Sequence, residues 1–314
     1  MKIIYQEKPL YPKILWQRPV HTYKAEAGKI LIIAGSKGST GTAILTCEAV
    51  FRSGTGILLL GFPESLKSFY KDVLPEAMTL ELPETPGHTL SRKAKNLILE
   101  NVRSCDVTII GPGLSTNAET IGLIWEVIFD ITKPVVVDAD GLIALIKGIE
   151  VMRARECEEF VTEYFKKRPN LMVITADAGE LSKLARALKL DKKYTNRYIE
   201  LHKEEFAPMI AQKLSCYAVI KGLQTVMAAP EGQIIVNRID TPNINMASAD
   251  DVLSGVVVSF MGQNPDKPLE AISTAIFLHG LAGKLASEQN NDRALLGSDI
   301  IRYLPKAIKI AEDL

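Results

Sequence analysis

The segment from Lys29 to Pro63, KILIIAGSKGSTGTAILTCEAVFRSGTGILLLGFP, predicts the fold more directly than any other part of the chain. An apolar, β-branched run ends in glycine, a segment with helical spacing follows, and a second apolar run begins at Ile57. Strands that alternate with helices are typical of a parallel sheet. Both runs are apolar throughout rather than at every second residue, so we expect helices to cover both faces of the sheet.

The same alternation continues toward the C-terminus. We expect further strands in AMTLEL, DVTIIGPG, PVVVDADG, LMVITA and YAVIKG, and a hairpin between TVMAA and QIIVN. Two long helices are expected after Asp251 and a last one in LGSDIIRYLPKAIKIAEDL. The prediction is a single α/β domain over residues 1–314, a three-layer α/β/α sandwich with a mostly parallel central sheet. Residues 1–27 are expected to form an N-terminal extension, and about 147–167 an exposed helical insertion.

The composition excludes several classes of protein. The 314 residues include 37 Lys and Arg and 37 Asp and Glu, and this balance argues against a general nucleic-acid binder. Four widely spaced cysteines argue against a zinc site or a disulfide framework, so we expect buried thiols in a reducing cytosol. The N-terminus lacks the apolar core of a secretory signal. The stretch PLEAISTAIFLHGLAGKLASE contains charged residues and predicts a buried helix rather than a membrane span.

The turns that follow the expected strands are the candidate ligand site. In an open parallel sheet, a ligand binds beyond the carboxyl ends of the strands. Five turns follow five strands and are expected to line one crevice together with the loop NMASADD; they are AGSKGSTG, GPGLS, DADG, TADAGE and KGLQT.

The first two of these turns are rich in glycine. Gly35 to Gly41 has the spacing G-x-x-G-x-x-G, which is neither a P-loop nor the G-x-G-x-x-G of dinucleotide-binding folds. Its glycines allow close backbone approach, and the helix that follows presents free N–H groups to an anion. Gly111 to Ser115 places two glycines around a proline, a rigid turn with little bulk. A plain strand exit explains each turn as well as a ligand does.

The charged residues of the other turns also have two explanations each. Asp138 and Asp140 end a strand, and they suit either a metal or, for Asp140, the N-cap of the next helix. Lys221 ends a buried strand and either meets a counter-charge or phosphate or extends its ammonium to water. Asp250 as an N-cap and Asp251 in the first helical turn need no chemistry.

Read together, these motifs resemble one family. Their order and spacing, from about Pro19 to Pro305, are similar to those of the ADP/ATP-dependent NAD(P)H-hydrate dehydratases of the ribokinase-like superfamily. The resemblance implies a ribokinase-like fold and repair of NADHX and NADPHX. ADP or ATP phosphorylates the hydroxyl that water added, and loss of phosphate restores the nicotinamide ring. It also implies assistance by Mg²⁺ and a homo-oligomer, often a tetramer, and the cysteine usage predicts a cytoplasmic location.

The resemblance also implies roles for particular residues. The hydrate-binding positions of the family fall on Ala43, Gly113, Asp177 and Asp251, and no protein metal ligand is implied. Asp251 would take the proton from the attacked hydroxyl, as a general base must. The nucleotide-binding positions fall on Asp250 and on the segment Lys221, Gly222, Leu223, Gln224 and Thr225.

Two loops depart from the family pattern. Asp177 stands where the family has a histidine that contacts the hydrate, and TADAGE replaces T-P-H-P-G-E. Asp250 and Ala247 stand where the family has glycines whose N–H groups meet the phosphate, and side chains there resist positive φ. At about 4 Å and an effective dielectric near 20, Asp250 would repel a phosphate charge by roughly 4 kcal/mol. That is about three powers of ten in rate, unless a bridging Mg²⁺ reverses the sign.

Two other functions remain alternatives at this stage. The altered loops motivate a catalytically impaired nucleotide-binding homologue, which would be stabilised by nucleotide without turnover. A small-alcohol kinase of the same superfamily would share Asp251 and the nucleotide site, although GPGLS and HGLAGKLA suit the dehydratases better. We expect His279, in the second of these segments, to be a packed helix residue rather than a catalytic one.

Overall fold

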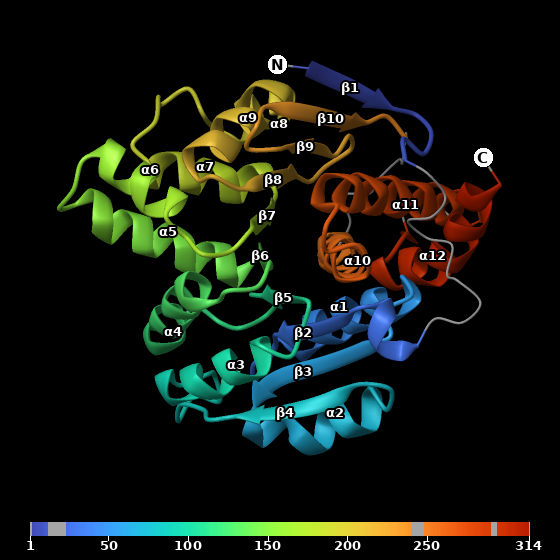
Figure 1. The fold of residues 1–314 in the computed structure, drawn as a ribbon, viewed down its shortest axis with the longest axis horizontal. Helices are drawn as coiled ribbons and strands as arrows, with labels where there is room; N and C mark the ends of the chain where they lie inside the picture. Colours follow the sequence, from blue (N-terminus) through green and yellow to red (C-terminus); the bar gives the residue numbers. More distant parts are fainter. Residues whose placement is uncertain (1, 12–22, 240–247, 290–293, 314) are drawn as a thin grey trace.

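The computed structural model describes residues 2–11, 23–239, 248–289 and 294–313, and the strands in these ranges form one ten-stranded sheet (Figure 1). The strand order is β1-β10-β9-β8-β7-β6-β5-β2-β3-β4. The strands are β1 (Lys2–Gln6), β2 (Lys29–Ile33), β3 (Ile57–Pro63), β4 (Met78–Leu82), β5 (Val107–Ile110), β6 (Val135–Asp138), β7 (Met172–Ala176), β8 (Tyr217–Ile220), β9 (Val226–Ala228) and β10 (Gln233–Asn237).

The sheet is mostly parallel, as predicted. Within the described ranges only β9 runs against its neighbours, β8 and β10. The remaining pairs are parallel. The predicted hairpin is confirmed, and its turn is closed by the Gly232 N–H, which donates to the Ala229 carbonyl at 2.9 Å.

Helices cover both faces of the sheet. The α-helices are α1 (Thr40–Arg52), α2 (Lys67–Val73), α3 (Lys95–Val102), α4 (Ala118–Asp130), α5 (Asp140–Arg153), α6 (Glu158–Lys166), α7 (Ala178–Ala187), α8 (Asn196–Leu201), α9 (Lys203–Lys213), α10 (Ala249–Gln263), α11 (Pro268–Gln289) and α12 (Gly297–Glu312). The described residues also form the short 3₁₀ helices η2 (Lys24–Ala27), which precedes β2, η3 (Glu64–Leu66) and η4 (Arg92–Ala94).

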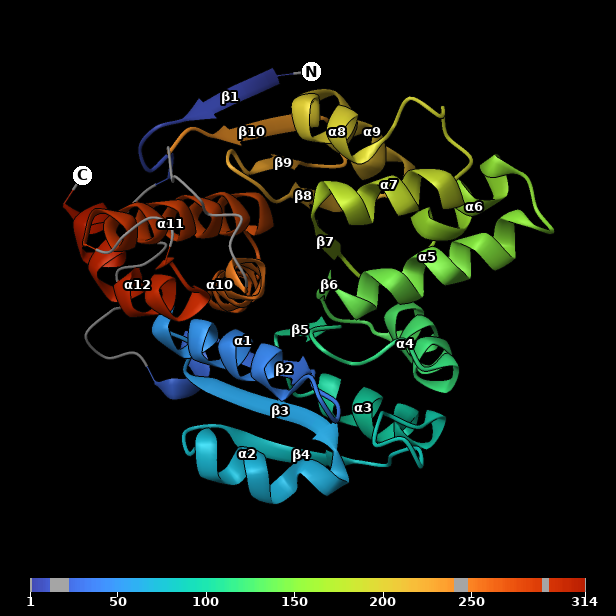
Figure 2. The same cartoon turned by 180° about the vertical axis from the view of Figure 1, so that it is seen from behind.

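The two helical layers belong to two separate apolar cores. Side chains of α3 to α9 pack in one core, and those of α1, α2, α10, α11 and α12 pack in the other. Figures 1 and 2 show the arrangement of these helices from opposite sides. Successive residues of a strand point to opposite faces. In β2, Leu31 and Ile33 therefore join the first core, whereas Ile30 and Ile32 join the second. This confirms the three-layer α/β/α sandwich.

Strand β1 was not anticipated by the sequence. It pairs in parallel with β10 and makes one edge of the sheet. Tyr5 holds it there from two sides, because its hydroxyl donates to Glu204 at 3.3 Å and its ring stacks against the Arg238 guanidinium.

Two further observations bear on the sequence analysis. Cys157 is exposed before α6, so the expectation that all four thiols are buried is wrong, although Cys47, Cys105 and Cys216 are buried. The segment 147–167 contains the end of α5 and all of α6, and it packs Phe165 into the core. No helix among the residues described is long and apolar enough to cross a membrane.

Candidate functional site

The first two glycine-rich turns lie against each other at the carboxyl ends of β2 and β5. The Gly35 N–H donates to the Pro112 carbonyl at 2.8 Å, and the Ser36 hydroxyl donates to the Gly113 carbonyl at 2.8 Å. Gly113 has φ +65°, and a Cβ there would lie 2.6 Å from the Ser39 carbonyl oxygen. Glycine is required at this position, and the structure joins both turns into one surface as the topology predicted.

Ala43 lies beneath this surface. It is fully buried on α1, and its Cβ would be 3.3 Å from a Cβ built on Gly35. Thr42 beside it is half-buried and gives a side-chain hydrogen bond to Asp251 of α10. The glycine turns and the start of α10 therefore meet at Thr42.

A buried ion pair joins the ends of β6 and β8. Lys221 Nζ lies 2.6 Å from Asp138 Oδ1, and the two side chains are 5% and 0% exposed. The Thr175 hydroxyl donates to the same carboxylate oxygen at 2.8 Å. Lys221 thus meets a counter-charge rather than extending to water. Burial alone would lower the pKa of Lys221, but the carboxylates of Asp138, Asp250 and Glu180 outweigh it and raise that pKa.

One atom of this pair is left without a partner. Asp138 Oδ2 is buried and accepts no hydrogen bond from the residues described. A buried carboxylate oxygen without a donor is unfavourable, and such atoms are commonly satisfied by an ion or by water. The unpartnered Oδ2 of Asp138 would therefore stabilise a cation at the end of β6.

Asp250 and Asp251 lie in the first turn of α10, and neither of them caps the helix. The N-cap is Ser248 in the left-handed conformation, with φ +71°. The expectation that Asp250 is the N-cap is therefore wrong, because the chain turns two residues earlier. Among the described residues of this loop, Ser248 has positive φ and Asp250 does not.

Both acids are destabilised as anions. Burial raises the pKa of Asp251 to about 7, with the Asp138 carboxylate adding to the effect, while Lys221 and the Thr42 hydrogen bond oppose it. Burial also raises the pKa of Asp250, and the charges of Lys221 and Lys203 oppose that shift. The result is a carboxylate, Asp251, that changes its charge near neutral pH.

The Lys221–Thr225 segment extends from this ion pair toward the surface. The Lys221 N–H continues the sheet by donating to the Ala176 carbonyl at 2.9 Å, and Gly222 then has φ +135°. Leu223 and Gln224 are exposed, whereas Thr225 is buried where β9 begins. The exposed part of the segment therefore presents its backbone and the side chains of Leu223 and Gln224 to a ligand.

Asp177 caps helix α7 in this structure. Its Oδ1 accepts from the Glu180 N–H at 2.7 Å, and Glu180 Oε2 accepts from the Asp177 N–H at 3.0 Å, which makes a capping box. Burial raises the pKa of Glu180 to about 7. Asp177 remains exposed at the carboxyl end of β7, so the residue in the histidine position is on the site's edge.

Two neighbouring residues support the site rather than form it. Asp140 does not cap α5, whose N-cap is Ala139; its Oδ2 accepts instead from the Ser115 N–H at 2.8 Å and fixes the second glycine turn. His279 is buried, and its Nε2 donates to the Ala249 carbonyl at 3.1 Å. Burial lowers the pKa of His279 to about 4, so the ring is neutral and packed, as expected.

The sequence analysis missed Lys203. It lies at the start of α9 on the face that also carries Phe206, Ala207 and Ile210, all buried. The helical spacing of a lysine with three apolar residues was a usable signal. Of the expected loop NMASADD, Asn245 to Ala247 lie outside the described residues.

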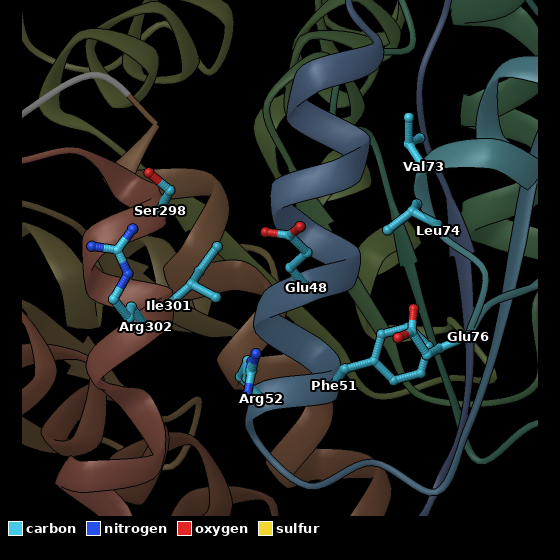
Figure 3. Close-up of a pocket in the computed structure, with 9 residues that line it drawn as sticks. All are labelled: Glu48, Phe51, Arg52, Val73, Leu74, Glu76, Ser298, Ile301 and Arg302. Carbon is cyan, nitrogen blue, oxygen red and sulfur yellow. The ribbon is translucent and has the colours of Figure 1, made fainter.

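The site holds no ready-made metal cluster, and a large cavity lies elsewhere. Among the described residues there is no group of three His, Cys, Asp or Glu side chains placed to hold a metal. A cavity of about 600 Å³ runs along α1, where Glu48 and Arg52 face α12 and Phe51 lies beside Glu76 (Figure 3). None of its lining residues is a predicted site residue.

The relatives of this chain include proteins named for the repair of NAD(P)H hydrate. The profile of a family described as NAD(P)H-hydrate dehydratase matches residues 30–306. The bifunctional NAD(P)H-hydrate repair enzymes Nnr of Moorella thermoacetica and Thermofilum pendens are 31% and 32% identical over 95% and 96% of this chain. The match covers 52% of each enzyme, so the chain spans about half the length of these relatives. The ADP-dependent (S)-NAD(P)H-hydrate dehydratase of Xanthomonas campestris is 27% identical over 90% of this chain and 88% of its own.

Solved structures share the fold. The ADP/ATP-dependent NAD(P)H-hydrate dehydratase of Bacillus subtilis, co-crystallised with ATP and Mg²⁺, superposes with a TM-score of 0.74 at 22% identity, over 97% of this chain and 99% of that one. A ribokinase-like superfamily protein of Enterococcus faecalis superposes with a TM-score of 0.71 at 22% identity, over 98% and 96%. The predicted ribokinase-like fold is confirmed.

Proposed function

Because the chain belongs to the NAD(P)H-hydrate dehydratase family, we propose that it dehydrates NADHX and NADPHX to NADH and NADPH at the expense of a nucleotide. The observation that carries the proposal is Asp251. Its carboxylate is at the start of α10 and has a pKa of about 7. The charges of Asp138 and Lys221 shift this pKa in opposite directions. The carboxylate is also hydrogen-bonded to Thr42, beside the glycine turns.

Asp251 is proposed as the general base. It accepts the proton of the hydrate hydroxyl while that oxygen attacks the terminal phosphoryl group, and the bond to the bridging oxygen breaks to leave AMP from ADP, or ADP from ATP. The C–O bond then breaks and phosphate leaves with its electron pair, while the neighbouring ring carbon loses a proton to solvent and the electrons of that C–H bond form the ring double bond. A base with a pKa near the working pH combines adequate basicity with a large ionised fraction.

The two ligands are proposed to bind on either side of Asp251. Gly113 and Asp177 would contact the hydrate, and the fully buried Ala43 would support this surface from beneath; in support of this, the Gly35 and Gly113 turns form one surface next to Thr42. The nucleotide would lie on the Lys221–Thr225 segment and near Asp250. The exposed Leu223 and Gln224 and the left-handed Gly222 support backbone contacts there.

The charges of the site fit a magnesium nucleotide. Lys221 is already neutralised by Asp138, so the surplus charge near α10 is that of Asp250 and Asp251. Mg²⁺ binds through one or two carboxylates and the phosphates, and it keeps several waters. Asp250 and the unpartnered Oδ2 of Asp138 would hold it. When bound, the ion neutralises phosphate charge.

A second candidate, a nucleotide binder without turnover, is favoured by Asp250 itself. Its carboxylate occupies the position of a phosphate-binding glycine and is buried enough to have a raised pKa. Nucleotide would then raise the melting temperature of the protein without any recovery of NADH.

Incubation with NADHX, Mg²⁺ and ADP or ATP tests both candidates, with recovery of NADH absorbance as the readout. The matched variants are Asp251→Asn and Asp266→Asn, since Asp266 is an exposed acid just beyond the other end of α10. We expect D266N to resemble the parent. If neither nucleotide supports recovery while a control enzyme is active, the dehydratase proposal is wrong.

We also propose, from the family resemblance, that residues 1–314 act as one ribokinase-like domain with an extension at 1–27 and an insertion at about 147–167, in a cytoplasmic homotetramer. Light scattering after size-exclusion chromatography measures the number of subunits, and a monomer would contradict the last part.

A further inference from the structure

Lys203 is a buried cation that the proposed reaction does not use. Its side chain is 6% exposed at the start of α9. The ammonium lies 2.7 Å from Glu200 Oε1 and donates to the Gln224 carbonyl at 3.3 Å. An ammonium has three N–H donors. Glu200 and Gln224 account for two of them, and among the described residues the third donor has no acceptor. Burial of a charge is unfavourable unless it is fully paired, which makes this lysine a candidate for a ligand.

The ammonium rests against the proposed nucleotide segment. A Cβ built on Gly222 would lie 2.1 Å from Lys203 Nζ, so the lysine occupies the space that the missing side chain leaves. The charge of Lys203 also acts on Asp250 in the first turn of α10. The cation therefore lies against the Lys221–Thr225 segment, and its charge acts on the start of α10.

A cavity opens on the same side. It has a volume of about 630 Å³, and Lys203, Leu223 and Gln224 are among its lining residues. Leu201 and Leu223, 68% and 50% exposed, contribute apolar surface to it. This volume is in the range of small-molecule sites. A nucleotide with its base in this cavity and its phosphates directed to α10 would pass Lys203.

We propose that Lys203 binds the phosphates of the nucleotide and offsets the charge of Asp250. The inference rests on the proposed function, since it assigns a residue to the same nucleotide site. Lys221 is held by the fully buried Asp138, whereas the Glu200 partner of Lys203 is 40% exposed and returns to water easily. A phosphate oxygen would replace Glu200 on the ammonium.

The test compares Lys203→Met with Lys193→Met. Lys193 forms a surface ion pair with Glu205 near the same helix and is the matched control. Calorimetric titration with adenosine, AMP, ADP and ATP separates base binding from phosphate binding. We expect K203M to weaken ADP and ATP by about tenfold to a hundredfold, the loss of one charge-assisted hydrogen bond, and adenosine by less than about twofold. K193M should leave all four unchanged.

Two further variants keep the test decisive. Lys203→Arg should retain most of the ADP affinity, because it keeps the charge. If K203M does not fold, Glu200→Gln replaces it, and removal of the competing carboxylate should tighten ADP severalfold while adenosine is unchanged. An equal loss for adenosine and ADP in K203M, or unchanged ADP binding in both K203M and E200Q, overturns the inference.

The outcome is separable from that of the proposed function. If ADP binding depends on Lys203 but no NADHX is dehydrated, the reaction is wrong and the phosphate contact stands. If the parent restores NADH and K203M has the same KM for ADP, the contact is wrong and the reaction stands.

Discussion

Replacement of Asp251 by asparagine is expected to lower activity and raise stability at the same time. Asparagine keeps the shape of the side chain but cannot accept the hydroxyl proton. Loss of a general base typically lowers turnover by about 10²–10⁴-fold. Because the pKa of Asp251 in the ligand-free protein is about 7, the parent should lose kcat/KM as the pH falls below 7, about tenfold per unit.

The stability change follows from the same pKa. The folded pKa is raised above the unfolded value of about 4, so the folded state holds the proton more tightly and stability falls as the pH rises between these values. A shift of roughly three units corresponds to about 4 kcal/mol, which is an upper limit for a half-buried side chain. The asparagine in D251N has no charge and avoids the cost of a buried carboxylate. The free energy of unfolding of D251N should therefore exceed that of the parent by an amount that grows from about pH 4 to about pH 7 and is constant at higher pH.

The assay is NADH recovery from NADHX alongside urea unfolding at several pH values, for the parent, D251N and D266N. D266N should follow the parent in both measurements. A fully active D251N would refute the role of base. A D251N that is less stable than the parent at pH 8 would refute the buried, destabilised carboxylate.

Three further outcomes are expected. Asp250→Gly should change kcat/KM with ADP by less than about tenfold, because Lys203 already offsets the carboxylate and the loss of a proposed Mg²⁺ ligand opposes the loss of repulsion; a gain near three powers of ten would show an uncompensated charge in steady-state kinetics. Lys221→Met should destabilise the protein by about 3–5 kcal/mol in chemical unfolding, because it leaves Asp138 buried and unpaired; the double variant with Asp138→Asn should recover much of this, and an equal loss in both would contradict it. His279 has a folded pKa of about 4, below the ordinary 6.5, so the parent should lose stability as the pH falls from about 6.5 to 4; His279→Gln should lose less in thermal melts across that range, and identical slopes would count against a buried neutral ring.

The layers of the fold could be predicted because they depend on local pattern. Apolar runs such as Leu31 to Ile33 have one dominant solution, a strand buried on both faces. Strand β1 was missed because its apolar pattern is short and Ile3 and Tyr5 stay half exposed. Its stability comes from pairing with β10, more than 200 residues away in sequence, which no local pattern reports.

The turns of the site could be brought together from topology, but their side chains could not be placed. Local sequence rules predict that Asp140 caps a helix. Its carboxylate instead accepts a hydrogen bond from the Ser115 N–H, 25 residues earlier in the sequence. Asp250 was predicted as a cap because aspartate is preferred at that position, whereas the N-cap is Ser248, which has φ +71°. The capping box of Asp177 and Glu180 was different, since its D-x-x-E spacing is a local signal that sequence reasoning could have used.

The edge position of β1 has a consequence for preparing the protein. Without residues 2–6, the outer side of β10 would present unpaired N–H and C=O groups beside the buried Ile234 and Val236. Such an exposed edge recruits strands from other molecules, so a chain trimmed at its start would be prone to aggregation. Fusion tags are therefore better attached after α12 than before β1.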